Sequence, residues 1–181
     1  MNGGPNPIVG IARVALGRPD GLRRFGGTVQ SFLTSLAPLI AFPLAGALIE
    51  LVREGLLPAL TLILVTLVAQ LTPPVLSHAL ARWWGREDQW LHYATAYNWC
   101  YWALPVVLAL LMIVLGMAAG AGLPQTVAAQ GVVAGLAAYS LWLHWFLARH
   151  ALALSRGKAA LLVVLVNAGT LILALGPALL G

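Results

Sequence analysis

Charged residues are scarce in this chain of 181 residues, which contains ten Lys and Arg and only five Asp and Glu. Charged residues make up 8% of the sequence, whereas 61% of the residues are hydrophobic. A soluble domain carries about 25% charged and about 45 to 50% apolar residues, so this composition excludes a soluble fold. The charges fall into short clusters, and the runs between the clusters are long enough to cross a bilayer.

Cysteine occurs once, as Cys100, which excludes an internal disulfide and a cysteine-rich metal site. The sequence also lacks the Gly-Lys-Ser phosphate loop, the dinucleotide-binding Gly pattern and the His-Glu-x-x-His zinc motif. The basic residues form no recognised nucleic-acid motif, so the net charge of +5 does not indicate nucleic-acid binding. These absences favour a protein that is not an enzyme and that holds no cofactor or metal.

Five apolar runs have about the length of 20 residues that a membrane-spanning helix needs. We therefore predict an all-α polytopic membrane bundle of five helices within residues 28–181. Pro38 and Pro43 are expected to kink the first span, and Pro73 and Pro74 to end or bend the second. The predicted spans cover residues 28–49, 56–77, 93–117, 126–146 and 159–180, and Pro105 lies inside the third.

The distribution of Lys and Arg predicts the orientation of the spans. Four precede the first span, two lie between the second and third spans, and three lie between the fourth and fifth. The connector after the first span contains one basic residue, Arg53, and the connector after the third span contains none. We expect Glu50, Arg53 and Glu54 to form the connector after the first span. Because cytoplasmic loops carry the excess of Lys and Arg, we predict a cytoplasmic N-terminus and a C-terminus outside.

Residues 1–27 precede the first span and include Arg13, Arg18, Arg23 and Arg24. Residues 8–16 are weakly amphipathic, as in a helix that lies on a membrane with its cations at anionic headgroups. A tethered tail whose arginines only set the topology is the alternative. The segment lacks an apolar core followed by a cleavage site, so we expect the first span to serve as the insertion signal.

Aromatic and basic residues mark a candidate surface for lipids or a membrane-protein partner. All seven Trp residues fall in or near the inferred cytoplasmic interface, and neighbouring arginines are potential partners of lipid phosphates. An ordinary interfacial aromatic belt is the alternative. The tyrosines that enter the third span also predict an aromatic cluster with the inner end of the fourth. The candidate surface comprises Arg82, Trp83, Trp84, Arg86, Tyr97, Trp142, Trp145 and Arg149.

Small and polar residues within the spans are candidates for helix packing. Gly131 and Gly135 form a GxxxG pair, which lets two helix backbones approach closely, either within one chain or in a homo-oligomer. Gln70, Asn98 and Asn167 are uncharged polar residues inside predicted spans. Hydrogen bonds between helices are the preferred interpretation of these three residues. A transport pathway is the alternative.

Histidine provides the remaining candidate chemistry. His92 and His144 are candidate axial ligands of a haem iron, since neutral imidazole is a good ligand, although both are expected in the wet interface. His78 and His150 map to the same side of the membrane. Asp88 and His92 lie four residues apart, but two ligands are too few for a closed metal site.

The order of elements and two short motifs resemble the bacterial Yip-type (Yip1 domain-like) membrane proteins. The motifs are Ala-Tyr-Asn-Trp at residues 96–99 and Tyr-Ser-Leu-Trp-Leu-His-Trp-Phe-Leu-Ala-Arg-His-Ala-Leu at residues 139–152. The resemblance covers most of the chain and implies a five-span bacterial inner-membrane protein without catalytic residues. The long cytosolic domain of the eukaryotic relatives and its Asp-Leu-Tyr-Gly-Pro-like stretch are missing, so binding of a GTPase is not implied.

These observations favour a non-enzymatic membrane protein that acts by interaction, either in membrane organisation or as an accessory subunit of a membrane complex. The expected partners are lipids with anionic headgroups, a membrane protein or a second copy of the chain. A transporter or lipid-handling protein for a neutral or amphipathic substrate is the first alternative, since the prolines can open helices around a cavity. A haem-binding electron carrier is the second.

Overall fold

The computed structural model describes residues 6–180, without the side chains of Phe42 and residues 175–180. Every regular element in this range is a helix, and five stretches are long and apolar enough to cross a membrane. The protein is thus an all-α, multi-pass membrane protein, as the sequence predicts. The elements are α1 (Pro7–Ala15), η1 (Pro19–Arg24), α2 (Val29–Glu54), α3 (Leu56–Trp83), α4 (Glu87–Cys100), α5 (Ala103–Gly120), α6 (Gln125–Ala151) and α7 (Arg156–Leu180).

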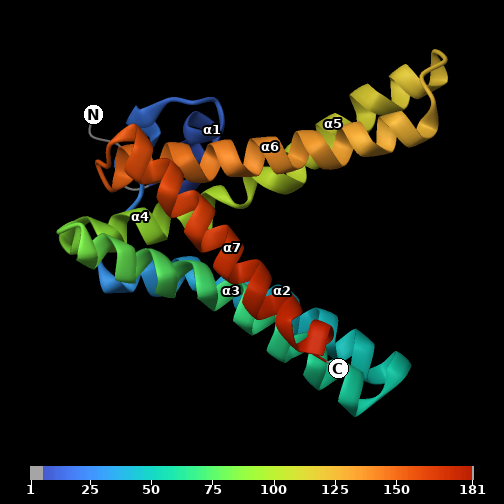
Figure 1. Cartoon of the computed structure of the whole chain (residues 1–181), viewed down its shortest axis with the longest axis horizontal. Helices are drawn as coiled ribbons and strands as arrows, with labels where there is room; N and C mark the ends of the chain where they lie inside the picture. The colour runs from blue at the N-terminus through green and yellow to red at the C-terminus, as the bar shows by residue number, and fades with distance from the viewer. Residues whose placement is uncertain (1–5, 181) are drawn as a thin grey trace.

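The helices form two arms that diverge from a common base (Figure 1). One arm contains α2, α3 and α7, and the other is the hairpin of α5 and α6. The base consists of α1, η1 and α4 together with the adjoining ends of the long helices. α1 lies at the base, whereas α7 ends at the far end of its arm, as an odd number of membrane crossings requires.

The buried core lies in the base rather than along the arms. Tyr93 of α4, Leu147 of α6 and Leu162 of α7 belong to one cluster and are almost fully buried. Large apolar side chains remain exposed along the arms, such as Val133 on α6 and Leu171 on α7. Hydrocarbon solvates such side chains as well as a protein interior does, so this exposure is stable in a bilayer.

The first two membrane-spanning helices continue past their predicted ends. α2 runs to Glu54, so Glu50 and Arg53 lie in the helix, and the expectation that they form a connector was wrong. The connector is Gly55, whose φ of 94° is a conformation that glycine adopts without steric cost. Hydropathy marks the part of a helix that sits in hydrocarbon, and the polar turns beyond that part give no such signal.

Pro38 and Pro43 lie inside α2, and Pro73 and Pro74 lie inside α3. α3 continues through Pro73 and Pro74 to Trp83, so these residues do not end the second span. The third span, predicted as one helix, is instead divided into α4 and α5. Pro105 has no N–H to donate to the carbonyl of Tyr101, which instead accepts the N–H of Leu104 at 3.0 Å. The break allows α4 to pack in the base and α5 to leave with α6.

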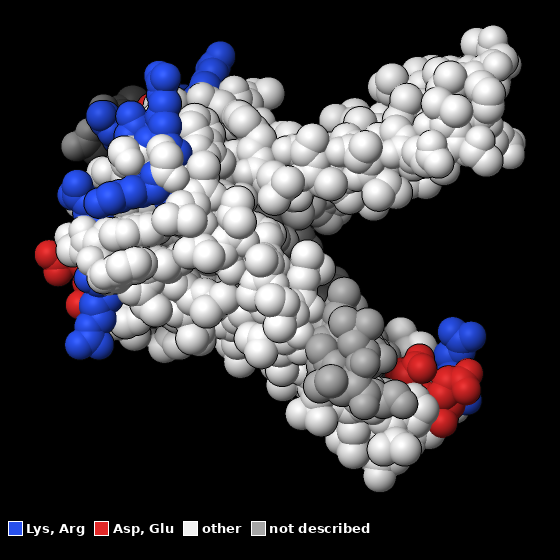
Figure 2. All heavy atoms as spheres, viewed as in Figure 1, with Lys and Arg blue, Asp and Glu red and all other residues white. Residues whose placement is uncertain are grey.

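Lys and Arg gather at the base of the molecule, on α1, η1 and the adjoining ends of α3, α6 and α7 (Figure 2). Arg53 lies with Glu50 and Glu54 at the far end of the three-helix arm. The turn between α5 and α6, residues 121–124, contains no charged residue. The cationic end of the molecule is therefore also the end that holds the packed core.

Candidate functional site

Four of the eight candidate surface residues lie together at the end of α3 and in the turn that follows it. Trp83 and Trp84 stack, with ring centroids 6.3 Å apart, and Trp83 is 76% exposed. Lys158 at the start of α7 holds its Nζ 5.9 Å from the centre of the Trp84 ring, which is a cation–π contact. Arg82 and Arg86 flank the two indoles, so the turn presents aromatic and cationic groups side by side.

The other candidate surface residues have internal partners. Trp145 donates its indole N–H to the carbonyl of Arg156 at 3.2 Å, and Arg149 donates to the carbonyl of Leu154. Both bonds close the turn between α6 and α7. Tyr97 is buried in the core, and Trp142 packs on Phe146 with ring centroids 5.5 Å apart. The predicted surface therefore divides into an exposed turn, three residues with contacts inside the base (Tyr97, Trp145 and Arg149), and Trp142, which is 37% exposed and packs on a ring of its own helix.

The predicted aromatic cluster between the third and fourth spans is present. The ring centroid of His144 on α6 lies 4.9 Å from that of Tyr97 and 6.4 Å from that of Tyr93, both on α4. Tyr101 extends the row, 4.8 Å from Tyr97. The Tyr97–His144 pair is edge-on, the Tyr97–Tyr101 pair is tilted and the Tyr93–His144 pair is stacked. Offset and edge-on arrangements at such distances are favourable for aromatic rings. The cluster fixes α4 against α6 at the point from which the arms diverge.

His144 is the centre of a buried polar chain that joins three helices. Asn167 of α7 donates through Nδ2 to the carbonyl of Val163 at 2.7 Å and to Nδ1 of His144 at 3.1 Å. Nδ1 therefore accepts, and the ring hydrogen resides on Nε2. Nε2 lies 2.8 Å from the hydroxyl oxygen of Tyr93 and donates to it. Both nitrogens of His144 are thus used between α4, α6 and α7.

Asn98 is the second intramembrane polar residue that links helices. Its Nδ2 donates to Ser35 Oγ of α2 at 2.9 Å, and Ser35 donates in turn to the carbonyl of Phe32 at 2.6 Å. Both side chains are buried. Gln70 differs, because its Oε1 is buried without a hydrogen-bond partner among the described residues. Asn98 and Asn167 therefore serve contacts between helices, which argues against a shared transport pathway.

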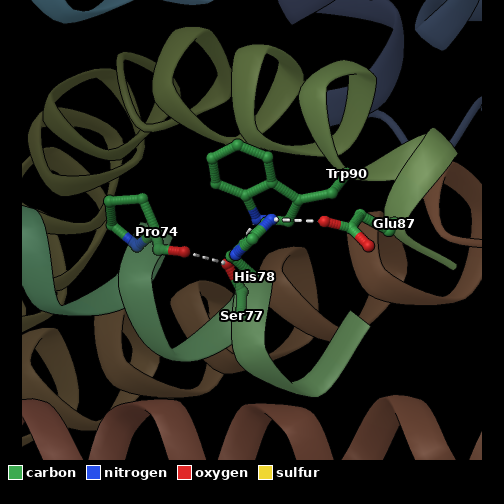
Figure 3. A network of polar contacts seen from close by, with 5 residues as sticks. All are labelled: Pro74, Ser77, His78, Glu87 and Trp90. Atoms are coloured by element: carbon green, nitrogen blue, oxygen red, sulfur yellow. Dashed lines mark hydrogen bonds and ion pairs between the residues drawn. The ribbon is translucent and has the colours of Figure 1, made fainter. Parts of the chain in front are cut away.

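A further polar network connects α3 to α4 (Figure 3). The indole N–H of Trp90 donates to Ser77 Oγ at 3.1 Å, and Ser77 donates to the carbonyl of Pro74 at 3.1 Å. The ring centroids of His78 and Trp90 lie 4.6 Å apart in an edge-on arrangement. His78 also places its Nε2 3.4 Å from Oε1 of Glu87. Ser35 and Ser77 were missed as sites, although each is a polar residue within a predicted apolar span.

The two histidines proposed as haem ligands point to different elements. His92 donates through Nε2 to the carbonyl of Leu22 in η1 at 2.9 Å, whereas His144 binds Tyr93 and Asn167. The structure thus does not bring the two rings together. Among the described residues, no group of three or more His, Cys, Asp and Glu side chains is arranged to hold a metal ion.

The glycine pair of α6 packs within the chain. A Cβ atom added to Gly131 would lie 3.0 Å from Cδ1 of Leu115, and one added to Gly135 would lie 3.2 Å from Cδ1 of Leu111. Both leucines belong to α5. The face of α6 that carries the two glycines is therefore already occupied by the neighbouring helix of the same arm.

The N-terminal helix α1 is held to α6 and η1 by specific contacts. Tyr139 of α6 donates to the carbonyl of Ala15 at 3.1 Å, and Gly17 lies beneath the Trp142 ring. Arg13 forms an ion pair with Asp20, which ties α1 to η1. The opposite face of α1 is uncovered and carries Ile8, Val9, Ala12 and Leu16, all exposed.

Comparison of the chain with family models, with curated proteins and with solved structures finds no match. The Yip-type resemblance therefore remains a prediction from the two motifs and the order of elements.

Proposed function

We propose that this protein is a non-enzymatic, membrane-organising protein of the bacterial inner membrane, and that its cationic end contacts the lipids of the cytoplasmic leaflet. The observation that carries the proposal is the uncovered apolar stripe of α1. Ile8 and Leu16 are 78% and 76% exposed at its two ends, next to the arginines of η1. An apolar stripe beside cations is the pattern of a helix that binds at a membrane surface.

The attachment of α1 supports the same proposal. A hydrogen bond from Tyr139 holds α1 to α6, and one from His92 holds η1 to α4, so the exposed stripe has a fixed position relative to the spans. A helix inserted at headgroup depth expands one leaflet only. Because α1 is attached to five membrane spans, it would expand that leaflet wherever the bundle is located. The buried bonds of His144 and Asn98 join helices, which supports a structural role for these polar residues.

The test compares the shape of vesicles that contain the protein. The variant Ile8→Ser/Leu16→Ser removes the apolar stripe, and Val52→Ser/Leu57→Ser changes two equally exposed residues at the other end of the molecule. Each protein is reconstituted into phosphatidylglycerol-containing vesicles, and vesicle diameters are measured by cryo-electron microscopy. We expect wild type and the control variant to shift the diameters, and the α1 variant to match empty vesicles. Equal shifts for all three proteins would contradict the proposal.

An accessory role in a membrane complex is a second proposal, favoured by the exposed indole of Trp83. A side chain of this size that is 76% exposed next to Arg82 and Arg86 resembles the aromatic and arginine anchors of interfaces. The variant Arg82→Ser/Trp83→Ser/Arg86→Ser should lose partners that wild type retains after gentle purification from the native membrane. Unchanged recovery of the same partners would exclude this surface.

A further inference from the structure

A groove of about 320 Å³ lies between α2, α3 and the start of α4. Its walls are hydrocarbon and indole side chains together with one imidazole, that of His78. Leu71 and Val75 of α3 line the groove and remain exposed, so it is open toward the surrounding bilayer. The groove was not identified from the sequence, because its walls come from three helices.

The groove has the length and the walls to hold a hydrocarbon chain. It follows α3 from Leu71 to His78, and seven residues of helix rise about 10 Å, compared with about 15 Å for half of a hydrocarbon core of about 30 Å. Phe32 and Trp90, with ring centroids 5.3 Å apart, form the wall at the end nearest the base. An acyl chain of the adjacent leaflet can therefore pack along the groove.

The end of the groove nearest the base carries a carboxylate. His78 holds its Nε2 3.4 Å from Oε1 of Glu87, and both side chains are partly exposed (Figure 3). An ionised carboxylate offers about four lone-pair sites, so Glu87 can accept N–H donors besides that of His78. A cationic group with N–H donors is the natural complement of this carboxylate.

A guanidinium lies one helical turn beyond His78. Arg82 follows His78 by four residues on α3 and is exposed. Residues at this spacing have Cβ atoms about 5 to 6 Å apart on one face of a helix. Guanidinium groups bind phosphate oxygens in a forked geometry. The end of the groove therefore combines a cation suited to phosphate with an anion suited to an ammonium group, which is the charge pattern that complements a zwitterion.

We propose that this groove binds one zwitterionic phospholipid with an ammonium headgroup, phosphatidylethanolamine. One acyl chain lies in the groove, the phosphate contacts Arg82, and the ammonium group donates to Glu87. Trp90 lines the groove at this end, as the indoles of membrane proteins do at headgroup depth. The inference goes beyond the proposed function, which concerns the apolar stripe of α1 and not the choice of a headgroup.

Native mass spectrometry of the purified protein in detergent, titrated with phosphatidylethanolamine, tests the groove. Leu36→Trp fills it, because Leu36 is one of its walls. Leu33→Trp places the same side chain at an exposed position of α2 that does not line the groove. We expect Leu36→Trp to abolish the bound lipid and Leu33→Trp to leave its affinity unchanged. Equal titration curves for wild type and both variants would show that lipid only coats an apolar surface, and would overturn the proposal.

The choice of headgroup has its own test, in which phosphatidylglycerol with the same acyl chains replaces phosphatidylethanolamine. We expect wild type to bind phosphatidylethanolamine about tenfold more tightly, which is the contribution of one charge-assisted contact. Glu87→Gln should remove this preference, whereas Asp88→Asn, which neutralises the neighbouring acid of the same helical turn, should keep it. Equal affinities of wild type for the two lipids, or the same result for both variants, would overturn the proposal.

The phosphate contact is separated from net charge by two arginine variants. Arg82→Gln should weaken both lipids about tenfold, since each carries a phosphate. Arg23→Gln removes an exposed charge of η1 and should weaken neither lipid. Equal losses would show attraction to charge alone and would contradict the role of Arg82.

Thermal unfolding of each variant establishes that it is folded. The headgroup comparison depends only on exposed side chains, so it tests the proposal even if Leu36→Trp does not fold. The vesicle experiment changes Ile8 and Leu16, which do not line the groove, so either proposal can fail while the other stands.

Discussion

Tyr93 and His144 are joined across the base of the molecule, where the hydroxyl oxygen of Tyr93 lies 2.8 Å from Nε2 of His144. The bond links α4 to α6, and Asn167 of α7 occupies the other ring nitrogen. α6 belongs to one arm and α7 to the other (Figure 1). His144 therefore connects the two arms at the point from which they diverge.

This connection predicts a measurable coupling between Tyr93 and His144. Tyr93→Phe removes only the hydroxyl, and His144→Phe removes both ring nitrogens. Hydrogen bonds between membrane helices contribute about 0.6 kcal/mol on average and up to about 1.7 kcal/mol. We expect a coupling within that range in a double-mutant cycle of unfolding free energies, measured in mixed micelles with increasing dodecyl sulfate. Additive single-variant effects would show that the contact does not stabilise the fold.

The Asn98–Ser35 bond predicts an asymmetric response to substitution. Ser35→Ala leaves the buried amide of Asn98 without its acceptor, and an unsatisfied buried donor costs about 1 to 3 kcal/mol. Removing both partners, in Ser35→Ala/Asn98→Leu, should restore part of that loss. The same unfolding measurement checks it, and a double variant less stable than both single variants would contradict the explanation.

The membrane spans were predictable because hydrocarbon imposes a length and a composition on any helix that crosses it. The ends of the helices were not predictable in the same way. Glu50 and Arg53 continue α2, and Arg149 continues α6, because a polar turn remains hydrogen-bonded as helix beyond the apolar run. The division of the third span was also missed, since Pro105 acts on the carbonyl of Tyr101 one turn before it.

The candidate site was predictable only in part, for a different reason. Gln70, Asn98 and Asn167 were identified by their polarity, but their partners depend on which helix faces meet. Short connectors made sequential spans the expected neighbours, and this holds for α2 with α3 and for α5 with α6. α3 also packs along α7, which is distant in sequence, and α5 leaves the base. No local pattern in the sequence encodes the divergence of the arms.

The packing of α6 on α5 predicts that Gly135 tolerates no large side chain. Gly135→Leu would force Leu111 from its place, and overpacking of this kind costs about 1 to 3 kcal/mol. Gly116 on α5 is a matched control, because no atom lies within 4 Å of a Cβ added there. Unfolding free energies of Gly135→Leu and Gly116→Leu check the prediction. A Gly116→Leu loss as large as that of Gly135→Leu would exclude this explanation.

The orientation of the chain is testable with single cysteines, because native Cys100 is only 1% exposed and should remain unlabelled. Ser155 lies in the turn between α6 and α7 at the cationic base, and Ala121 lies at the tip of the two-helix arm; both are exposed. If the base faces the cytoplasm, a membrane-impermeant maleimide added to intact cells should label Ala121→Cys and not Ser155→Cys. Lysis should then make Ser155→Cys reactive. The reverse pattern in intact cells would place α1 at the outer leaflet, and the nine cations of the base would then contradict the charge rule from which the orientation was predicted.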